Sequence, residues 1–165
     1  MLAEMLCDRN DTKVLTTRLE HHANDLPWRD KAKVYYCNVD EMGKINLDEI
    51  EEKLHRAKGT IKYVTVAGAS NVTGYILPIH KIAELVHHYG ARMLVDGAQL
   101  VAHREINIKG ETEDEALDAL IFSGHKMYAP FGSGVIVVKE ELLEGKKPFL
   151  LGGGTVEAVF DDDVY

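Results

Sequence analysis

The chain has 165 residues, enough for one domain of ordinary size. Its 27 Asp and Glu outnumber its 19 Lys and Arg, and the net charge of -8 argues against binding nucleic acid or a membrane surface through bulk charge. With 45% hydrophobic residues the composition is that of a globular protein, and no apolar run approaches the ~20 residues of a membrane span.

The order of apolar segments predicts an α/β fold. Met1–Leu6 reads as the last turns of a helix whose start precedes the chain. Short apolar runs then alternate with amphipathic stretches, a rhythm typical of strand–helix units with a mostly parallel sheet. The predicted strands, most of them rich in Val, Ile and Leu, are Lys13–Leu19, Lys33–Val39, Ile61–Ala67, Arg92–Val95, Leu117–Phe122 and Gly134–Val138.

Two helices are well marked between these strands. The first is predicted over Leu47–Lys58, with Asn46 as N-cap and Glu49 placed as in a capping box. The second is predicted over Ile79–Tyr89, with apolar residues at helical spacing, Pro at its first turn and Gly at its C-terminal stop. With helices on both faces of the sheet, the expected architecture is a three-layer α/β/α arrangement.

Further along the chain, the acidic run at 110–118 (GETEDEALD) is most simply a solvated loop. Residues 155–165 follow three glycines without a closing element and are expected to be a frayed tail of a single domain spanning 1–165. Both ends look cut, so we expect a piece of something longer.

The two cysteines, Cys7 and Cys37, show neither a disulfide framework nor a zinc-binding pattern, so we expect no metal and a reducing compartment. The N-terminus has no pattern of charged, apolar and small residues typical of a secretory signal. We therefore expect a cytoplasmic protein.

Four polar clusters carry the chemistry, and three of them directly follow a predicted strand, where open α/β sheets bind ligands. They are EHHAN at 20–24, ASNVTG at 69–74, DGAQ at 96–99 and SGHK at 123–126. Each alone has an ordinary explanation, such as a turn, a helix-entry loop or a solvated lysine. Together they offer a carboxylate, an amide, a hydroxyl, imidazoles and an amine, the set needed to hold pyridoxal phosphate.

The requirements of that cofactor match particular residues. Its aldehyde needs a nucleophilic amine, for which Lys126 is the candidate. Its pyridine nitrogen needs a carboxylate that stabilises the protonated form, and Asp96 is placed for this. Gln99 could donate to the ring hydroxyl, and His21 could stack on the ring face. The phosphate needs hydroxyl and imidazole donors, which Ser123 and His125 supply just before the lysine.

The stretch from His21 to Gly154 resembles the large domain of the class V aminotransferase family, which belongs to the fold type I pyridoxal phosphate enzymes. It is most similar to the cysteine desulfurase branch, with the related selenocysteine lyases. The resemblance rests on motifs in matching order and spacing: EHHAN at 20–24 with Pro27-Trp28 after it, SNVTG at 70–74, VDGAQ at 95–99, SGHKMYAPFGSG at 123–134 and GGGT at 152–155.

The resemblance implies a role for each matching residue. It makes Lys126 the residue that bonds to the cofactor aldehyde and His21 a ring-stacking group that can help move protons. By the same comparison, Asp96 pairs with the pyridine nitrogen and Gln99 contacts the ring oxygen. The remaining matches imply that Ser123 and His125 bind the phosphate and that Asn71 binds the substrate carboxylate. They imply no role for His22 beyond structure.

Departures from the family pattern are also visible. Family members have about 400 residues by this resemblance, so the upstream phosphate-binding loop, the downstream small domain with its substrate-binding Arg and the loop with the sulfur-accepting Cys are missing. Neither Cys7 nor Cys37 matches that Cys. Gly68-Ala69 stands where desulfurases often have His-Val, and Ala129 replaces a usual Gly. We therefore expect the chain alone to be weakly active or inactive.

The leading hypothesis is a pyridoxal phosphate-binding segment of an enzyme that removes sulfur from cysteine to give alanine, acting as a homodimer. Alternatives are another class V aminotransferase or lyase, or a non-catalytic truncated domain whose sheet edges favour self-association. A nucleotide-binding fold is disfavoured because no glycine-rich turn follows the first strand and opens a helix.

Overall fold

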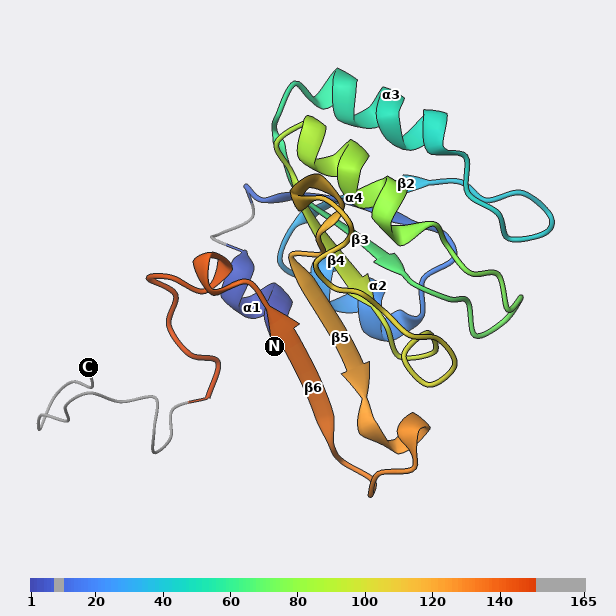
Figure 1. Ribbon diagram of the computed structural model, residues 1–165. Helices are drawn as coiled ribbons and strands as arrows, with labels where there is room; N and C mark the ends of the chain where they lie inside the picture. The colour runs from blue at the N-terminus through green and yellow to red at the C-terminus, as the bar shows by residue number, and fades with distance from the viewer. Residues whose placement is uncertain (8–10, 151–165) are drawn as a thin grey trace, which may run out of the picture.

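A six-stranded sheet runs through the computed structural model, which describes residues 1–7 and 11–150 (Figure 1). Its strand order is β2-β1-β3-β4-β5-β6, with every neighbouring pair parallel except β5 and β6. The strands are β1 (Lys13–Thr17), β2 (Lys33–Cys37), β3 (Ile61–Ala67), β4 (Arg92–Asp96), β5 (Ala119–Ser123) and β6 (Gly134–Val138). The predicted α/β class with a mostly parallel sheet is confirmed.

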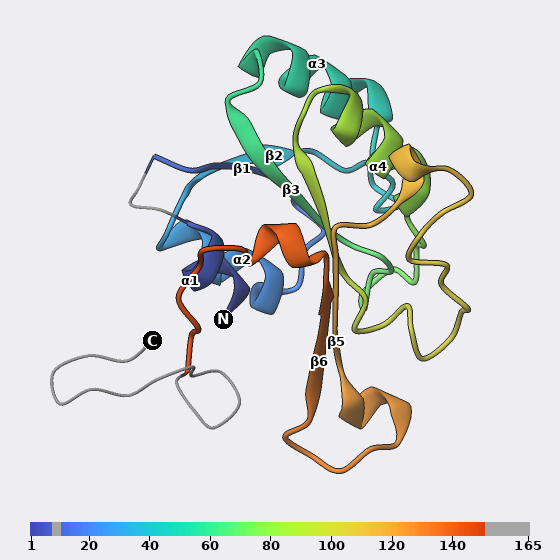
Figure 2. The ribbon, with the colours of Figure 1, turned by 60° about the vertical axis from the view of Figure 1, so that its left-hand side comes forward.

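Helices cover the two faces of the sheet, as Figure 2 shows. The α-helices are α1 (Leu2–Leu6), α2 (His22–Arg29), α3 (Leu47–Ala57) and α4 (Ile79–His88), and the short 3₁₀ turns are η1 (Glu113–Glu115), η2 (Gly124–Met127) and η3 (Glu140–Leu142). Helices α3 and α4 pack on one face, while α1 and α2 pack on the other. This is the expected three-layer arrangement.

Alternation along single strands divides the core between these faces. In β1, Val14 packs with α1 and α2, whereas the next residue, Leu15, packs with α3 and α4. In β4, Leu94 faces α1 and α2 while Met93 and Val95 face the other layer. All five side chains are at most 1% exposed, so these strands are covered on both faces, as is typical of parallel strands between two layers of helices.

The element boundaries differ from the predicted ones by a few residues. Strands β1 and β2 each end two residues earlier than predicted, and β4 includes Asp96. Helix α3 ends at Ala57, because Lys58 takes a left-handed conformation with φ 49°. The side chain of Asn46 caps α3 by accepting from the Asp48 N–H at 2.9 Å, whereas the Glu49 carboxylate turns to Asn38 instead of completing a capping box.

Helix α2 was not predicted. Pro27 lies within it, and only Asn24, Asp25 and Trp28 are buried, so no apolar stripe marks it. Its sequence signal is instead polar pairing at a spacing of four residues, since Arg29 Nε donates to Asp25 Oδ1 at 2.9 Å and Trp28 Nε1 donates to Asn24 Oδ1 at 3.4 Å.

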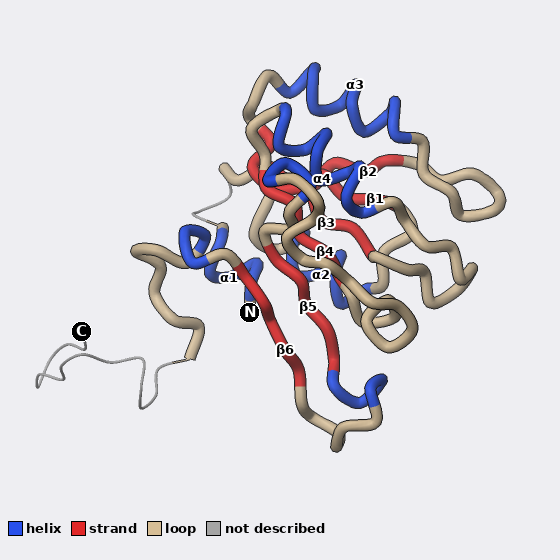
Figure 3. The backbone as a smooth tube through the Cα atoms, in the orientation of Figure 1, coloured by secondary structure: helices blue, strands red, loops and turns tan. Residues whose placement is uncertain are grey.

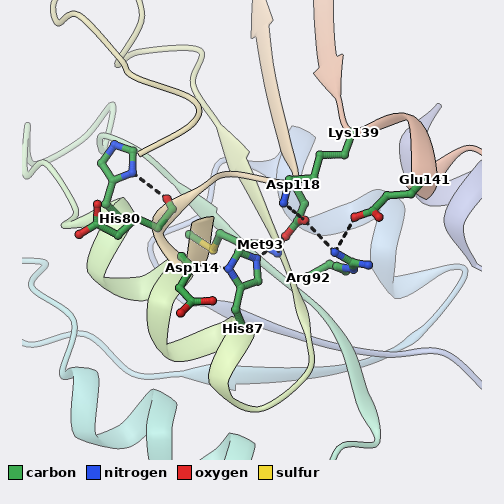
Figure 4. A network of polar contacts seen from close by, with 9 residues as sticks. His80, His87, Arg92, Met93, Asp114, Asp118, Lys139 and Glu141 are labelled. Atoms are coloured by element: carbon green, nitrogen blue, oxygen red, sulfur yellow. Dashed lines mark hydrogen bonds and ion pairs between the residues drawn. The ribbon is translucent and has the colours of Figure 1, made fainter. Parts of the chain in front are cut away.

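The prediction that 110–118 is a solvated loop is wrong over its last three residues. Residues 111–114 are exposed, but 116–118 are buried, and Asp118, directly before β5, is fully buried. Its carboxylate accepts from the Met93 N–H at 2.7 Å and lies near three basic groups: His87 Nε2 at 2.6 Å, Lys139 Nζ at 3.1 Å and Arg92 Nη1 at 3.2 Å (Figure 4). A charge at this position is buried because it is paired.

The His87–Asp118 contact predicts a pH-dependent stability. The hydrogen bond to Asp118 raises the pKa of His87, and the backbone carbonyl of Asp114 adds to this, while burial and the Lys139 charge oppose it. Because the folded pKa exceeds the unfolded value, His87 stabilises the fold fully below about pH 6.5 and loses this contribution as pH rises through the folded pKa.

We therefore expect His87→Gln to destabilise the chain more at pH 6 than at pH 9, as measured by urea unfolding. His88→Gln, on the exposed next position, should show no such difference. An equal loss at both pH values for His87→Gln would refute the pairing.

No helix within residues 1–7 and 11–150 has the length and apolar character to cross a membrane. The GGGT motif at 152–155 and the predicted tail at 155–165 lie outside the described residues.

Candidate active site

The site is built on the edge formed by the C-terminal ends of β1, β3, β4 and β5, which are consecutive in the sheet (Figure 3). Asp96, the last residue of β4, pairs with Ala67 at the end of β3 and with Ile121 of β5. Its carbonyl accepts from the Gly68 N–H at 2.8 Å, and the Gly97 N–H donates to the Ile121 carbonyl at 2.7 Å. The segments that follow these strands therefore start side by side.

The carboxylate of Asp96 is partly buried at this edge. Its Oδ1 accepts from the Ala98 N–H at 2.9 Å, which holds the side chain at the start of the following turn. Gln99 is partly buried in the same turn, which is closed by a 3.0 Å hydrogen bond from the Val101 N–H to the Gly97 carbonyl. Asp96 and Gln99 thus approach the edge from one short segment.

Lys126 lies in η2, directly after β5. Strand β5 continues from Ile121, the partner of Asp96, to Ser123, and two strand residues span about 7 Å. The 3₁₀ turn then carries His125 and Lys126, of which Lys126 is partly buried and His125 is exposed. The amine and the carboxylate therefore come from neighbouring strands, with the end of β5 reaching beyond that of β4.

Local packing explains why the chain turns at this place. The Gly124 N–H donates to the Ser133 carbonyl at 2.9 Å, and a Cβ on Gly124 would lie 2.4 Å from Ser133 Oγ, so a larger residue would displace the Ser133 side chain. Tyr128 ends the turn in a left-handed conformation, with φ 62°. The His125 ring stacks on Phe131 with 5.1 Å between centroids, which links the two sides of the β5–β6 connection.

His21 stands at the end of β1 as the N-cap of α2. Its Nδ1 accepts from the Ala23 N–H at 3.1 Å, so a neutral ring carries its proton on Nε2. His21 is exposed, and its ring is tilted against that of His22 with 6.3 Å between the centroids. His22, by contrast, begins the helix. Burial acts to raise the pKa of the nearby Asp25, but the hydrogen bonds from Arg29 and Tyr36, with the charges of Arg29 and His22, lower it overall.

Asn71 lies on the loop that follows β3. Ser70 is buried, and its Oγ accepts from the N–H groups of Val72 and Thr73 at 3.2 Å each. The Gly74 N–H donates to the Ser70 carbonyl at 3.1 Å, which closes the loop and leaves Asn71 exposed at its turn. All seven predicted site residues therefore lie at the ends of strands, or on the segments that follow them, at the same sheet edge.

The cysteines do not join this group. Cys37 is fully buried at the end of β2, and burial, with the charge of Glu49, raises the pKa of its thiol to about 12. A thiol that stays protonated is a poor nucleophile. Cys7 follows α1 on the other side of the sheet, and the two residues form no disulfide. Among the described residues, no group of three or more His, Cys, Asp or Glu is arranged to hold a metal.

The sequence did not predict the polar contacts of the residue before His21. The preceding residue, Glu20, accepts from Thr17 Oγ1 at 2.6 Å and from Asn24 Nδ2 at 2.7 Å. Thr17 and Asn24 are buried, whereas Glu20 is partly buried. The spacing of Glu20 and Asn24 by four residues was the available signal, but it carries weight only once α2 is known.

Comparison with known proteins agrees with this arrangement of strands and motifs. The family model of the class V aminotransferases matches residues 2–164. A probable cysteine desulfurase of Chlamydia muridarum is 41% identical over 155 residues, covering 91% of this chain and 37% of the relative. A cysteine desulfurase of Synechococcus elongatus is 37% identical over 161 residues, covering 93% of this chain and 24% of the relative.

Solved structures give the same result. The apo structure of a cysteine desulfurase from Thermococcus onnurineus NA1 matches with a TM-score of 0.84 and 31% identity, covering 99% of this chain and 42% of that one. A cysteine desulfurase from Escherichia coli matches with a TM-score of 0.86 and 29% identity, again over 99% of this chain and 41% of that one.

Fold and site together define an α/β segment with its polar residues at the carboxyl edge of a parallel sheet. The chain belongs to the class V aminotransferase family, and within it is similar to cysteine desulfurases. It spans 37% and 24% of the two curated relatives described above.

Proposed function

We propose that this chain is the pyridoxal phosphate-binding segment of a cysteine desulfurase-like enzyme, which removes sulfur from cysteine and leaves alanine. The class V aminotransferases are a pyridoxal phosphate-dependent family. The observation that carries the proposal is the placement of a carboxylate, Asp96, and an amine, Lys126, after neighbouring parallel strands that end at one edge. Open α/β sheets bind ligands at such an edge.

The residues at the edge fit the chemistry of this cofactor. When bound, pyridoxal phosphate supplies an electron-withdrawing ring that stabilises negative charge on the substrate carbon next to the amino group. Asp96 would keep the ring nitrogen protonated, because a partly buried carboxylate favours a neighbouring positive charge. Gln99 would donate an amide N–H to the ring oxygen, and the imidazole of His21, an exposed residue, would stack on the ring.

The β5–β6 connection would hold the other end of the cofactor. The hydroxyl of Ser123 and the imidazole of His125 are donors suited to a phosphate group. Lys126 Nζ would bind the aldehyde carbon, and once the substrate amine takes its place it could carry a proton to or from the substrate. Asn71, exposed on its loop, would donate its side-chain amide to the substrate carboxylate.

The sulfur acceptor has no counterpart among the described cysteines, because Cys37 is buried and its raised pKa keeps the thiol protonated. We propose that the accepting thiol comes from outside this segment, so the chain alone would bind cofactor but convert cysteine slowly or not at all. Two alternatives to this proposal are that the chain belongs to an enzyme with another class V reaction, or that it has no catalytic activity.

We further propose that the chain, a single domain, acts as a homodimer. Tyr128 and Phe131, beside Lys126, are 102% and 93% exposed, and the apolar side chains of Val135 and Val137 on the edge strand β6 are also exposed. Apolar groups of this kind at an uncovered sheet edge favour association. Light scattering of the purified chain should give twice the mass of one copy, and a monomer would contradict the dimer.

The cofactor proposal is tested by adding pyridoxal phosphate to the purified chain, reducing with borohydride and mapping the modified peptides. We expect a visible absorption band and one modified lysine, Lys126. A colourless mixture, or label spread evenly over surface lysines, would instead support the non-catalytic truncated domain.

A further inference from the structure

Glu20 occupies the joint between β1 and α2, one residue before the N-cap His21. Its two carboxyl oxygens contact different elements, because Oε1 accepts from Thr17 Oγ1 of β1 at 2.6 Å and Oε2 accepts from Asn24 Nδ2 of α2 at 2.7 Å. The backbone of Ala67, at the end of β3, has a smaller effect on this carboxyl group and lowers its pKa. One side chain thus joins β1 to α2 directly before the predicted ring-stacking residue.

These contacts continue into a buried polar network. Asn24 Oδ1 accepts from Thr65 Oγ1 of β3 at 2.7 Å and from Trp28 Nε1 at 3.4 Å. Thr16 Oγ1 donates to the Thr65 carbonyl at 2.8 Å. Asn24 and Thr65 are buried, so a broken contact would leave a polar group without water. The joint beneath His21 is therefore fixed rather than loosely packed.

The charge of Asp96, which lies at the end of β4, affects the pKa of Glu20. Burial, the largest effect, raises its pKa to about 7, the hydrogen bonds from Thr17 and Asn24 oppose the rise, and the negative charge of Asp96 adds to it. Among the elements packed around Glu20, β4 contributes the charge of Asp96, whereas β1, α2 and β3 contribute neutral donors. The Thr17 hydroxyl can donate to a carboxylate or accept from the protonated acid.

We infer that Glu20 is a positioning residue of the candidate site, which fixes His21 over the cofactor position by tying the segment between β1 and α2 to both elements and, through Asn24, to β3. The inference rests on the proposed function, since a positioned ring at His21 has a role only if a cofactor binds there. Glu20 itself touches neither cofactor nor substrate in this role. It acts through His21 on one side and through the Asp96 charge on the other.

The first test uses the cofactor-free chain and the NMR signal of the Asn24 side-chain amide, which donates to Glu20. We expect this signal to move with pH, with a midpoint near 7 set by the ionisation of Glu20. The movement should vanish in Glu20→Gln and remain in Glu84→Gln, an exposed position on α4 with the same substitution. A signal that moves equally in Glu20→Gln would overturn the inference.

The second test measures the affinity for pyridoxal phosphate by absorbance. We expect Glu20→Ala to weaken binding about tenfold, and Glu20→Gln by less than about threefold, since the amide keeps polar contacts with both Thr17 and Asn24. If circular dichroism shows that Glu20→Ala does not fold, the titration of the Asn24 signal in Glu20→Gln still tests the contact between Glu20 and Asn24. Wild-type affinity in both variants would refute the positioning role alone, whereas a wild-type chain that attaches no cofactor would refute the proposed function first.

Discussion

Asp118→Asn is expected to lower the free energy of unfolding by about 3 kcal/mol. The side-chain oxygen of the asparagine can still accept from the Met93 N–H. The asparagine carries no negative charge, however, to compensate the positive charges of Lys139, Arg92 and His87. Breaking a buried ion pair typically costs about 3–5 kcal/mol, and the lower end applies here because Arg92 and Lys139 are partly exposed and recover water. Urea unfolding of the purified chains at pH 7 measures the difference.

Asp114→Asn is the matched control, because Asp114 is exposed on the same segment and engages His87 only through its backbone carbonyl. It should change the free energy of unfolding by less than about 0.5 kcal/mol. Equal effects of the two substitutions would contradict the account of the network. The hydrogen bonds and cations lower the pKa of Asp118 to about 2 despite its burial, so its contribution is present above about pH 4 and is lost only as pH falls through 2.

Lys126→Ala is expected to abolish the covalent attachment of pyridoxal phosphate. The amine is the group that bonds to the aldehyde, and the substitution removes it without altering the β5–β6 pairing, which is made by the backbone. The visible band of the mixture should disappear, and borohydride should leave no cofactor mass on the chain. The measurement combines absorbance with intact-mass spectrometry.

Lys81→Ala provides the comparison, since Lys81 is exposed on α4. It should retain the band and the added mass of the wild-type chain. Retention of specific labelling in Lys126→Ala would mean that another lysine reacts, and the assignment of Lys126 would then be wrong.

The strands and the helices α3 and α4 could be predicted from sequence because their apolar residues follow a regular pattern. Apolar residues make up most of β3, and α4 repeats Ile79, Ile82 and Val86 at helical spacing, so both were placed within a residue of their observed ends. Helix α2 could not be found in this way. Its buried residues are mainly polar, and their partners on β3 lie about 40 residues away in the chain.

The candidate site likewise has parts that could be predicted from sequence and parts that could not. The clusters after β1, β4 and β5 were visible because strand ends meet at one edge of a parallel sheet. The contacts of Glu20 and Asp118 depend on which strands are neighbours and which face a side chain takes. Asp118 in particular stands at the end of an acidic run, where only the sheet order brings Arg92 and Lys139 to it. The roles of the site residues toward a cofactor stay predictions.

The most direct test of the central proposal is a crystal structure of the chain grown with pyridoxal phosphate. We predict continuous density between Lys126 Nζ and the cofactor, with the carboxylate of Asp96 within hydrogen-bonding distance of the pyridine nitrogen on the opposite side. A cofactor bound elsewhere, or an Asp96 carboxylate that faces away from the ring while Lys126 is modified, would contradict the proposal.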